Sequence, residues 1–329
     1  MSLCARGSLR AHLFFLKTGM EEWFVIVNPV SGHGRGAREW PRIEKLLVKA
    51  GFDYTFNFSS SKYEAIDLAD SAVRMGFRKI MVVGGDGTMH EVLNGLYRQQ
   101  EVPMSDITVG VIPVGTGNDW VRHFGIPHDY QAAIDVILEG RIFHQDIIRA
   151  RYQTPKGVGE RVVANIAGIG LDASVIEAVD AAEKRGRKGR WTYLWCLIKT
   201  VLTHKSQPYE VEIDGRRIEY PAMFSAAVGN NRFNGGGLEQ LPAALADDGL
   251  AEVMILGHLR LKAVPRALKC LLGGRINDIP EVENYRGRQV MFTSPQPRPV
   301  ELDGELVGTT RAEFEVLPAA LRVIVPSTF

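Results

Sequence analysis

Short apolar runs alternate with segments of helical periodicity along the first third of the chain. The apolar runs are typical of buried strands, and the segments between them place apolar residues at helical spacing. This alternation predicts βαβ units with right-handed crossovers and a parallel sheet, in an α/β domain spanning 20–127. The predicted strands are 22–29, 53–59, 79–85 and a run that begins at 107; the predicted helices are 37–51, 61–75 (capped by Ser61) and 89–100.

The pattern changes after Gly125. One more helix is predicted at 129–139, and one long helical stretch at 172–203. The rest consists of β-like runs, which predict a mainly antiparallel β domain over 128–317, packed against the first domain with a cleft between them. These runs are 142–152, 161–169, 209–220, 222–229, 251–256, 289–293, 299–302, 312–317 and 321–325.

Three glycine-rich loops, 30–36, 84–88 and 115–119, each follow a predicted strand. In open α/β sheets, ligands bind outside the carboxyl ends of the strands. Glycine lets backbone N–H groups approach an anion closely, and the N-terminus of a following helix adds a favourable dipole. Any one loop could be an ordinary turn, but three in equivalent places favour a phosphate-binding site.

Two better-known phosphate motifs do not account for this site. The sequence contains no GxxxxGK[ST], the motif of P-loop enzymes. "GIGLDA" (168–173) imitates the dinucleotide fingerprint, but it lies outside the alternating region. We interpret it as a turn in the second domain.

Length, charge and cysteine content exclude several classes of function. A chain of 329 residues is long enough for two domains, and a net charge of +1 provides no basic field for nucleic acid. Cys4, Cys196 and Cys270 are far apart, which predicts neither a disulfide framework nor a zinc site and fits a reducing cytoplasm. The short apolar patch "HLFFL" is too short for a secretory signal. Residues 1–19 are predicted to be an extension outside the fold.

The motifs "NPVSG", "GGDGT…E…N" and "PVGTGND", in this order, resemble the bacterial diacylglycerol kinase-like lipid kinases. Sphingosine and ceramide kinases are more distant relatives, and NAD kinases and phosphofructokinases share the GGDG loop. The resemblance continues through "GNNRFNGGG", "LPAALADDGLAEV" and "ELDGE". It implies an ATP:lipid phosphotransferase with a phosphofructokinase-like first domain and a β-sandwich second domain. It also implies that 318–329 return to the first domain.

The resemblance implies a set of nucleotide-site residues. Thr88 could also cap a helix beginning near Met89. Glu91 could reach the same loop from one turn further along that helix, although an exposed carboxylate is the commoner case. The implied residues are Asn28, Ser31, Ser59, Gly84, Gly85, Asp86, Gly87, Thr88, Glu91, Gly115, Thr116, Asn118 and Asp119.

Phosphoryl transfer needs positioning, charge neutralisation and an acceptor for the hydroxyl proton. Asp86 and Asp119 are the carboxylates at the loops and could hold a catalytic Mg²⁺ directly or through water. By resemblance Glu305 would be the base, with Asp303 assisting. The sphingosine kinase branch gives the base role to the aspartate equivalent to Asp86, so both assignments stay open. "DGE" is also an ordinary hairpin turn.

"LPAALADDGLAEV" resembles the structural Mg²⁺ site of the family. The implied ligands are the Asp248 carboxylate and the backbone carbonyls of Leu245 and Leu250, with Asp146 linked through water. A solvated turn is the alternative interpretation.

The stretch 183–202 has five basic residues within 184–190, followed by apolar residues at helical spacing. This combination suits an anionic membrane surface, although a core helix behind a solvated loop is the commoner arrangement. We expect a cytoplasmic enzyme, peripherally associated with the membrane, that takes a lipid substrate from its surface. The resemblance also implies a homodimer. A kinase of a soluble acceptor, such as NAD or a sugar phosphate, and a non-catalytic nucleotide- or lipid-binding protein remain the alternatives.

Overall fold

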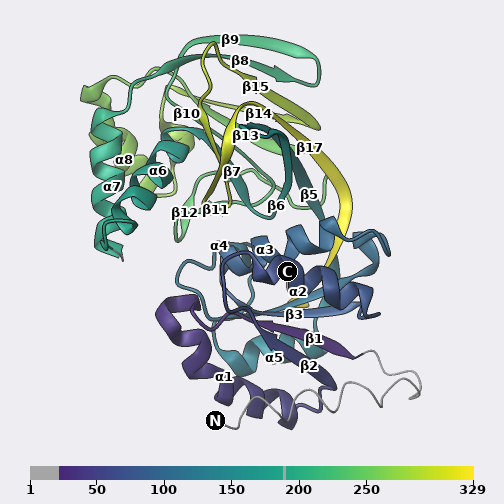
Figure 1. Ribbon diagram of the computed structural model, residues 1–329. Coiled ribbons are helices and arrows are strands. Elements are labelled where there is room, and N and C mark those ends of the chain that lie inside the picture. Colours follow the sequence, from purple (N-terminus) through teal and green to yellow (C-terminus); the bar gives the residue numbers. More distant parts are fainter. Residues whose placement is uncertain (1–21, 188–189) are drawn as a thin grey trace.

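The computed structural model describes residues 22–187 and 190–329, so the prediction for 1–19 falls outside the described residues. Two units are stacked, with the α/β unit below the β-rich unit in Figure 1. Among the described residues, no helix is long and apolar enough to cross a membrane.

The N-terminal unit is a parallel sheet between two layers of helices. The apolar runs are continuous because both faces of the sheet are covered. Helices α2 and α3 pack on one face and α1 and α5 on the other. The strands are β1 (Trp23–Val27), β2 (Tyr54–Phe58), β3 (Lys79–Gly84) and β4 (Thr108–Pro113), in spatial order β2-β1-β3-β4; the helices are α1 (Ser31–Lys49), α2 (Glu64–Arg74), α3 (Asp86–Arg98), a short α4 (Asp119–His123) and α5 (Tyr130–Glu139).

The starts of α1 and α2 differ from the predictions. Helix α1 begins at Ser31, but Gly32, His33 and Gly34 have positive φ, so the predicted loop survives as a break inside the first turns. Helix α2 begins at Glu64 rather than at Ser61. The Glu64 carboxylate accepts the backbone amides of Ser60 and Ser61, at 2.6 and 2.9 Å, so these amides are satisfied without a Ser61 cap.

The second unit is an antiparallel sandwich, as predicted. One layer has the order β14-β13-β10-β7-β16, and the other is formed by β6, β5, β17, β15, β8 and β9. Apolar side chains from both layers meet in one core. The strands are β5 (Arg141–Thr154), β6 (Gly157–Val163), β7 (Ile166–Gly170), β8 (Gln207–Ile213), β9 (Arg216–Met223), β10 (Ser225–Gly229), β13 (Ala251–Leu256), β14 (Val282–Gly287), β15 (Gln289–Thr293), β16 (Pro299–Leu302) and β17 (Glu305–Val325), with a small separate pair, β11 (Phe233–Asn234) and β12 (Leu238–Glu239).

The predicted helical stretch 172–203 consists of two helices, α6 (Leu171–Glu183) and α7 (Arg190–Thr203), which pack side by side (Figure 1). Helix α8 (Val264–Leu272) and strand β14 were not predicted, and both are short. Three 3₁₀ turns complete the described elements: η1 (Met104–Asp106), η2 (Leu261–Ala263) and η3 (Ile276–Asp278).

Strand β17 connects the two units. Its end pairs in parallel with β4, Arg322 opposite Thr108 and Val323 opposite Val109, so the last residues lie in the N-terminal sheet. Helix α5 also belongs there, because Ile134 and Ile137 pack into the core beneath that sheet. We therefore place the division between the units after α5. The long antiparallel pairing of β17 with β5 runs through the junction and fixes how the units sit together.

Candidate active site

The three glycine-rich loops meet at the carboxyl edge of the parallel sheet. A Cβ atom added to Gly115 would lie 2.5 Å from the Cα of Gly85, and one added to Gly85 would lie 3.5 Å from the Ser31 Oγ. No side chain fits at these two glycines, so the close approach of the loops requires them. The convergence predicted from the strand ends is present.

Asn28 joins two of these loops. Its Oδ1 accepts the amides of Val30 and Ser31 at 3.1 and 3.2 Å, and its Nδ2 donates to the Thr88 Oγ1 at 2.8 Å. Thr88 is buried in the first turn of α3, which begins at Asp86 with Gly85 as its N-cap residue. The prediction that Thr88 caps this helix is therefore wrong, because the helix starts two residues before it.

Asp86 connects the second loop to the third. Its carboxylate accepts the backbone amides of Asp119 and Trp120, both at 3.0 Å, and so caps the N-terminus of α4. Burial raises the pKa of Asp86 to about 6, against the opposing effect of the two amides, and the negative charges of Asp119 and Asp303 raise it further. Asp86 thus holds the backbone that carries Asp119.

One carboxylate oxygen of Asp119 receives no hydrogen bond from the described residues. Its Oδ2 accepts the Gly236 amide at 2.7 Å, while no described residue donates a hydrogen bond to the buried Oδ1. The Arg122 guanidinium is 3.7 Å from that oxygen. Burial raises the pKa of Asp119, with the Gly236 amide opposing it. A buried carboxylate oxygen beside a second acid suits Mg²⁺, which prefers hard oxygen ligands, so this pair fits the ion.

Some of the remaining loop residues face open space, and others form hydrogen bonds within the protein. Thr116 is exposed, and a Cβ on Gly87 would meet no atom within 4 Å. Ser59 is buried at the end of β2, where its amide donates to the Val27 carbonyl at 2.9 Å. Asn118 takes a left-handed conformation (φ 53°) and donates to the Gly115 carbonyl, and no described residue donates to its buried Oδ1.

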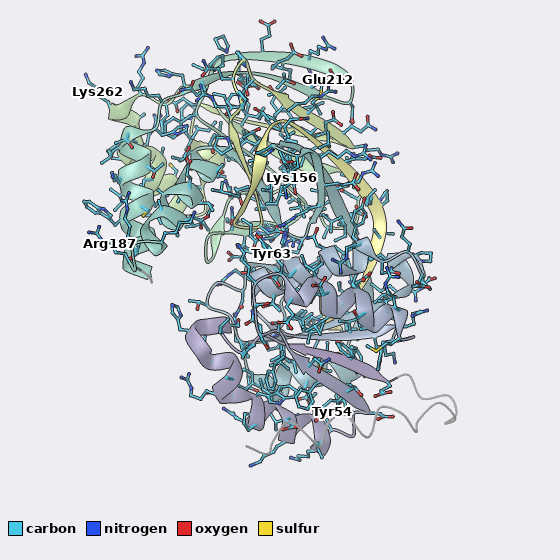
Figure 2. All side chains as sticks on the ribbon, viewed as in Figure 1. Tyr54, Tyr63, Lys156, Arg187, Glu212 and Lys262 are labelled. Atoms are coloured by element: carbon cyan, nitrogen blue, oxygen red, sulfur yellow. The ribbon has the colours of Figure 1, made fainter. Side chains whose placement is uncertain are left out.

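Glu91 does not face the phosphate loop. Its carboxylate accepts the amides of Tyr63 and Ala65 at 3.1 and 3.3 Å and so binds the first amides of α2. Tyr63 lies at the junction of the two units (Figure 2). The expected nucleotide contact of Glu91 is therefore wrong in this structure, because unpaired helix amides are the nearer partners.

Asp303 and Glu305 have different surroundings although only Gly304 separates them. Asp303 accepts four hydrogen bonds: from the His90 Nδ1 at 2.7 Å and from the amides of 164, 165 and 166 at 2.7–3.1 Å. Glu305 forms ion pairs with Arg161 at 3.1 Å and Lys62 at 3.5 Å. Asp303 therefore fixes the backbone, whereas Glu305 is held by side chains that can move.

A cavity of about 200 Å³ lies between the loops and the second unit. Its lining includes the acids Asp86, Asp119 and Asp303 together with Asn165 and the segment 234–236. Glu305 is not part of this lining, although the adjacent Gly304 is. The structure thus brings the predicted acids of the two domains together, with Glu305 just outside.

A second, apolar cavity of about 110 Å³ adjoins the first and shares Asn234 and Gly235 with it. Apolar side chains line most of it, and five of them are leucines and valines of α7 and α8. At its polar end Asp172 accepts the Ser225 Oγ at 3.1 Å and the Gln240 Nε2 at 2.9 Å. Burial raises the pKa of Asp172 to about 6, against the opposing effect of these two donors.

The acids implied as part of a structural Mg²⁺ site contact other groups of the protein in this structure, and the bound ion stays a prediction. The Asp248 carboxylate pairs with the Arg286 guanidinium and accepts the Leu250 amide. Both oxygens of Asp146 accept backbone amides, those of Gly249 and Ala319, at 2.6 and 2.7 Å. The positive charge beside Asp248 in this structure is that of the Arg286 guanidinium.

Several site residues escaped the sequence reasoning. No sequence motif marked Asn165. Asn234 and Gly236 belong to the motif "GNNRFNGGG", but no role was predicted for them. His90 and Asn94 lie inside the helix predicted after the GGDG loop, and their burial (1% and 7% exposed) became evident only when the second domain was in place.

Comparisons with known proteins agree with this architecture. Residues 22–150 match the diacylglycerol kinase catalytic domain, and 165–325 match the YegS C-terminal NAD kinase beta sandwich-like domain. A diacylglycerol kinase of Mycobacterium tuberculosis (strain ATCC 25618 / H37Rv) is 29% identical over 321 residues, 97% of this chain and 98% of its own. One from Bacillus subtilis (strain 168) is 29% identical over 305 residues, 92% and 95% of the two chains.

Solved structures support the fold alone at their levels of identity. The crystal structure of a diacylglycerol kinase from Bacillus anthracis str. Sterne has a TM-score of 0.70 at 21% identity, covering 95% of this chain and 99% of that one. Yeast NADH kinase has a TM-score of 0.52 at 10% identity, covering 93% and 83%. With both domains matched in order along nearly its whole length, the chain belongs to the bacterial diacylglycerol kinase-like lipid kinase family.

Proposed function

We propose that this protein is an ATP-dependent lipid kinase that transfers the γ-phosphate to a hydroxyl of diacylglycerol or a related lipid. The observation that carries the proposal is the contact between the two cavities at Asn234 and Gly235. The acid-lined cavity adjoins the phosphate-binding loops, and the apolar cavity suits an acyl chain. A lipid hydroxyl could therefore enter the first cavity while its chain occupies the second.

The nucleotide would bind at the loop edge of the parallel sheet. Gly87 and Thr116 leave open space there, and the N-terminus of α3 favours an anion. Asp119, with Asp86 beside it, would hold Mg²⁺. When bound, that ion neutralises charge on the phosphate oxygens. Asp86 contributes by capping α4 and so orienting Asp119.

We assign proton removal to Glu305 rather than to Asp86. Both oxygens of Asp86 already accept backbone amides, which leaves it poorly placed to approach a hydroxyl. Glu305 follows Gly304 of the cavity wall, and its partners Lys62 and Arg161 are long side chains that can reorient. Arg161 and Lys62 would also attract the negative charge of the transferred group.

Peripheral membrane association is part of the proposal. Trp195, Ile198 and Leu202 of α7 are 63%, 40% and 55% exposed, while Leu197 and Val201 on its other face line the apolar cavity. Arg187 lies on the outer side of the α6–α7 pair (Figure 2). An exposed apolar row beside basic residues suits an anionic bilayer, from which a lipid could reach the cavity. The homodimer and the lack of a nucleic-acid partner remain predictions.

The experiment is a transfer assay with labelled ATP, Mg²⁺ and purified protein. Vesicles would present diacylglycerol, phosphatidylglycerol, a sphingoid base or a polyprenol, and parallel reactions would contain NAD or a sugar phosphate. We expect label in a lipid product. Label only in a soluble product would establish the soluble-acceptor alternative. ATP binding without transfer to any acceptor, in wild type and Glu305→Ala alike, would establish a non-catalytic protein.

A further inference from the structure

Helix α3 reaches both units of the molecule. Its N-terminus carries Asp86 at the phosphate-binding loops, and its body packs against β6 of the second unit (Figure 1). His90 and Asn94 are four residues apart and therefore share one face of the helix. Both are buried, and both contact the second unit.

Asn94 fixes the helix to β6. Its Nδ2 donates to the Val162 carbonyl at 3.0 Å, and its Oδ1 accepts the Val162 amide at 2.9 Å. The same Nδ2 lies 3.3 Å from the His90 Nε2. Both hydrogens of this nitrogen have carbonyl acceptors, because it also donates to the His90 carbonyl at 2.8 Å. The proton on Nδ1 is instead placed by the Asp303 carboxylate, which can only accept from the imidazole.

The Nδ1–H of His90 donates to the Asp303 Oδ2 at 2.7 Å. The remaining contacts of Asp303 are the amides of 164, 165 and 166, which follow β6 and include part of the cavity wall. Asp303 and Gly304, with φ of 49° and 86°, form the tight turn from β16 into β17, where Glu305 is the first residue. One side chain from α3 therefore holds the turn and the wall together.

We propose that His90 is a positioning residue that sets the acceptor side of the cavity relative to the phosphate-binding end of α3. It acts through Asp303, which arranges the 164–166 backbone and the start of β17. This inference rests on the proposed kinase function. It adds that alignment of the two domains for transfer depends on one imidazole that bridges them.

The test compares His90→Asn with His90→Leu. Asparagine places an N–H where the Nδ1–H stands, whereas leucine fills similar space without a donor. We expect His90→Leu to lower kcat by on the order of 10²-fold, because the cavity wall at 164–166 would be misplaced for transfer. The KM for ATP should change little. His90→Asn should recover most of the rate. His144→Leu, at an exposed histidine of β5, is the matched control.

A double-mutant cycle with Asp303→Asn separates positioning from general packing. If His90 acts through Asp303, the double variant should be no slower than the slower single variant. Unchanged kcat in His90→Leu, equal losses in His90→Leu and His90→Asn, or additive losses in the cycle would each overturn the inference. Should His90→Leu fail to fold, His90→Gln takes its place, because its amide lies one bond beyond the Nδ1 position.

The two proposals fail in distinguishable ways. A wild-type protein that phosphorylates no lipid would overturn the proposed function and this inference with it. An active wild type with an equally active His90→Leu would overturn the inference alone.

Discussion

The two adjoining cavities are built by different means. The acid-lined cavity is formed by loops at strand ends, where backbone amides donate hydrogen bonds to Asp86, Asp119 and Asp303. The apolar cavity is formed by side chains from helices and strands that are far apart in the sequence. Each contains an acid whose pKa burial raises to about 6, Asp86 in one and Asp172 in the other. The contrast teaches that short motifs build the acid-lined cavity, whereas the apolar cavity depends on packing between distant segments.

The largest effect should come from Glu305→Gln, at the edge of the acid-lined cavity. If Glu305 is the base, kcat should fall by about 10³-fold, within the range of general base catalysis, with little change in the KM for ATP. Single-turnover kinetics with labelled ATP would measure it. Asp86→Asn is the informative comparison: substantial turnover there supports our division of roles, and the reverse pattern would return the base role to Asp86.

Asp119→Asn should lower turnover by about 10²-fold by removing a charge from the predicted Mg²⁺ position. A higher Mg²⁺ concentration should restore part of the loss, because the amide oxygen is a weaker ligand. Turnover as a function of Mg²⁺ concentration is the measurement, with the exposed Asp247→Asn as control. A Mg²⁺ dependence identical to wild type would remove Asp119 from the metal position.

Ala267→Phe narrows the apolar cavity from α8, where Ala267 is one of the lining residues. The larger ring should lower kcat/KM by about 30-fold for long-chain acceptors and much less for short-chain ones, because a steric cost of ~2 kcal/mol falls on the chain. Rates on acceptors of graded chain length would show it. An equal loss at every chain length would place the chain elsewhere. Ala132→Phe on α5 of the other unit provides a matched control.

The smallest effect concerns stability. The pKa of Asp172 is about 6 in the folded protein and near 3.8 when unfolded, so the folded state binds more protons between about pH 4 and 6. The contribution of Asp172 to the free energy of unfolding therefore falls as pH rises through that window and stays low above it. Asp172→Asn should stabilise the protein by about 1–2 kcal/mol at pH 8 and much less at pH 4.

Thermal unfolding across this pH range would test the sign. Asp247→Asn again serves as the exposed control. A destabilisation of Asp172→Asn at pH 8 would mean that the ionised carboxylate makes a favourable contact that outweighs its burial.

Local patterns predicted the α/β unit well because strands β1, β3 and β4 are buried on both faces and a glycine-rich loop follows each of them directly. The predicted helix starts were less accurate. The helix containing Thr88 begins at Asp86, and α2 begins at Glu64, whose carboxylate accepts the amides of Ser60 and Ser61. The prediction that Glu91 contacts the nucleotide had the same weakness. Its observed partners, the amides of Tyr63 and Ala65, belong to the start of another helix, which a local pattern does not reveal.

The sequence alone determined the class of fold, the three glycine-rich loops at strand ends and the ordered motifs of a lipid kinase family, since each depends on neighbouring residues. Only the tertiary structure decided what the acids do. Asp303 is bound by His90, 213 residues earlier, and by amides up to 139 residues earlier, while Glu305 pairs with the Lys62 and Arg161 side chains. The physical reason is that a carboxylate's role depends on which donors surround it, and folding brings those donors from distant parts of the chain.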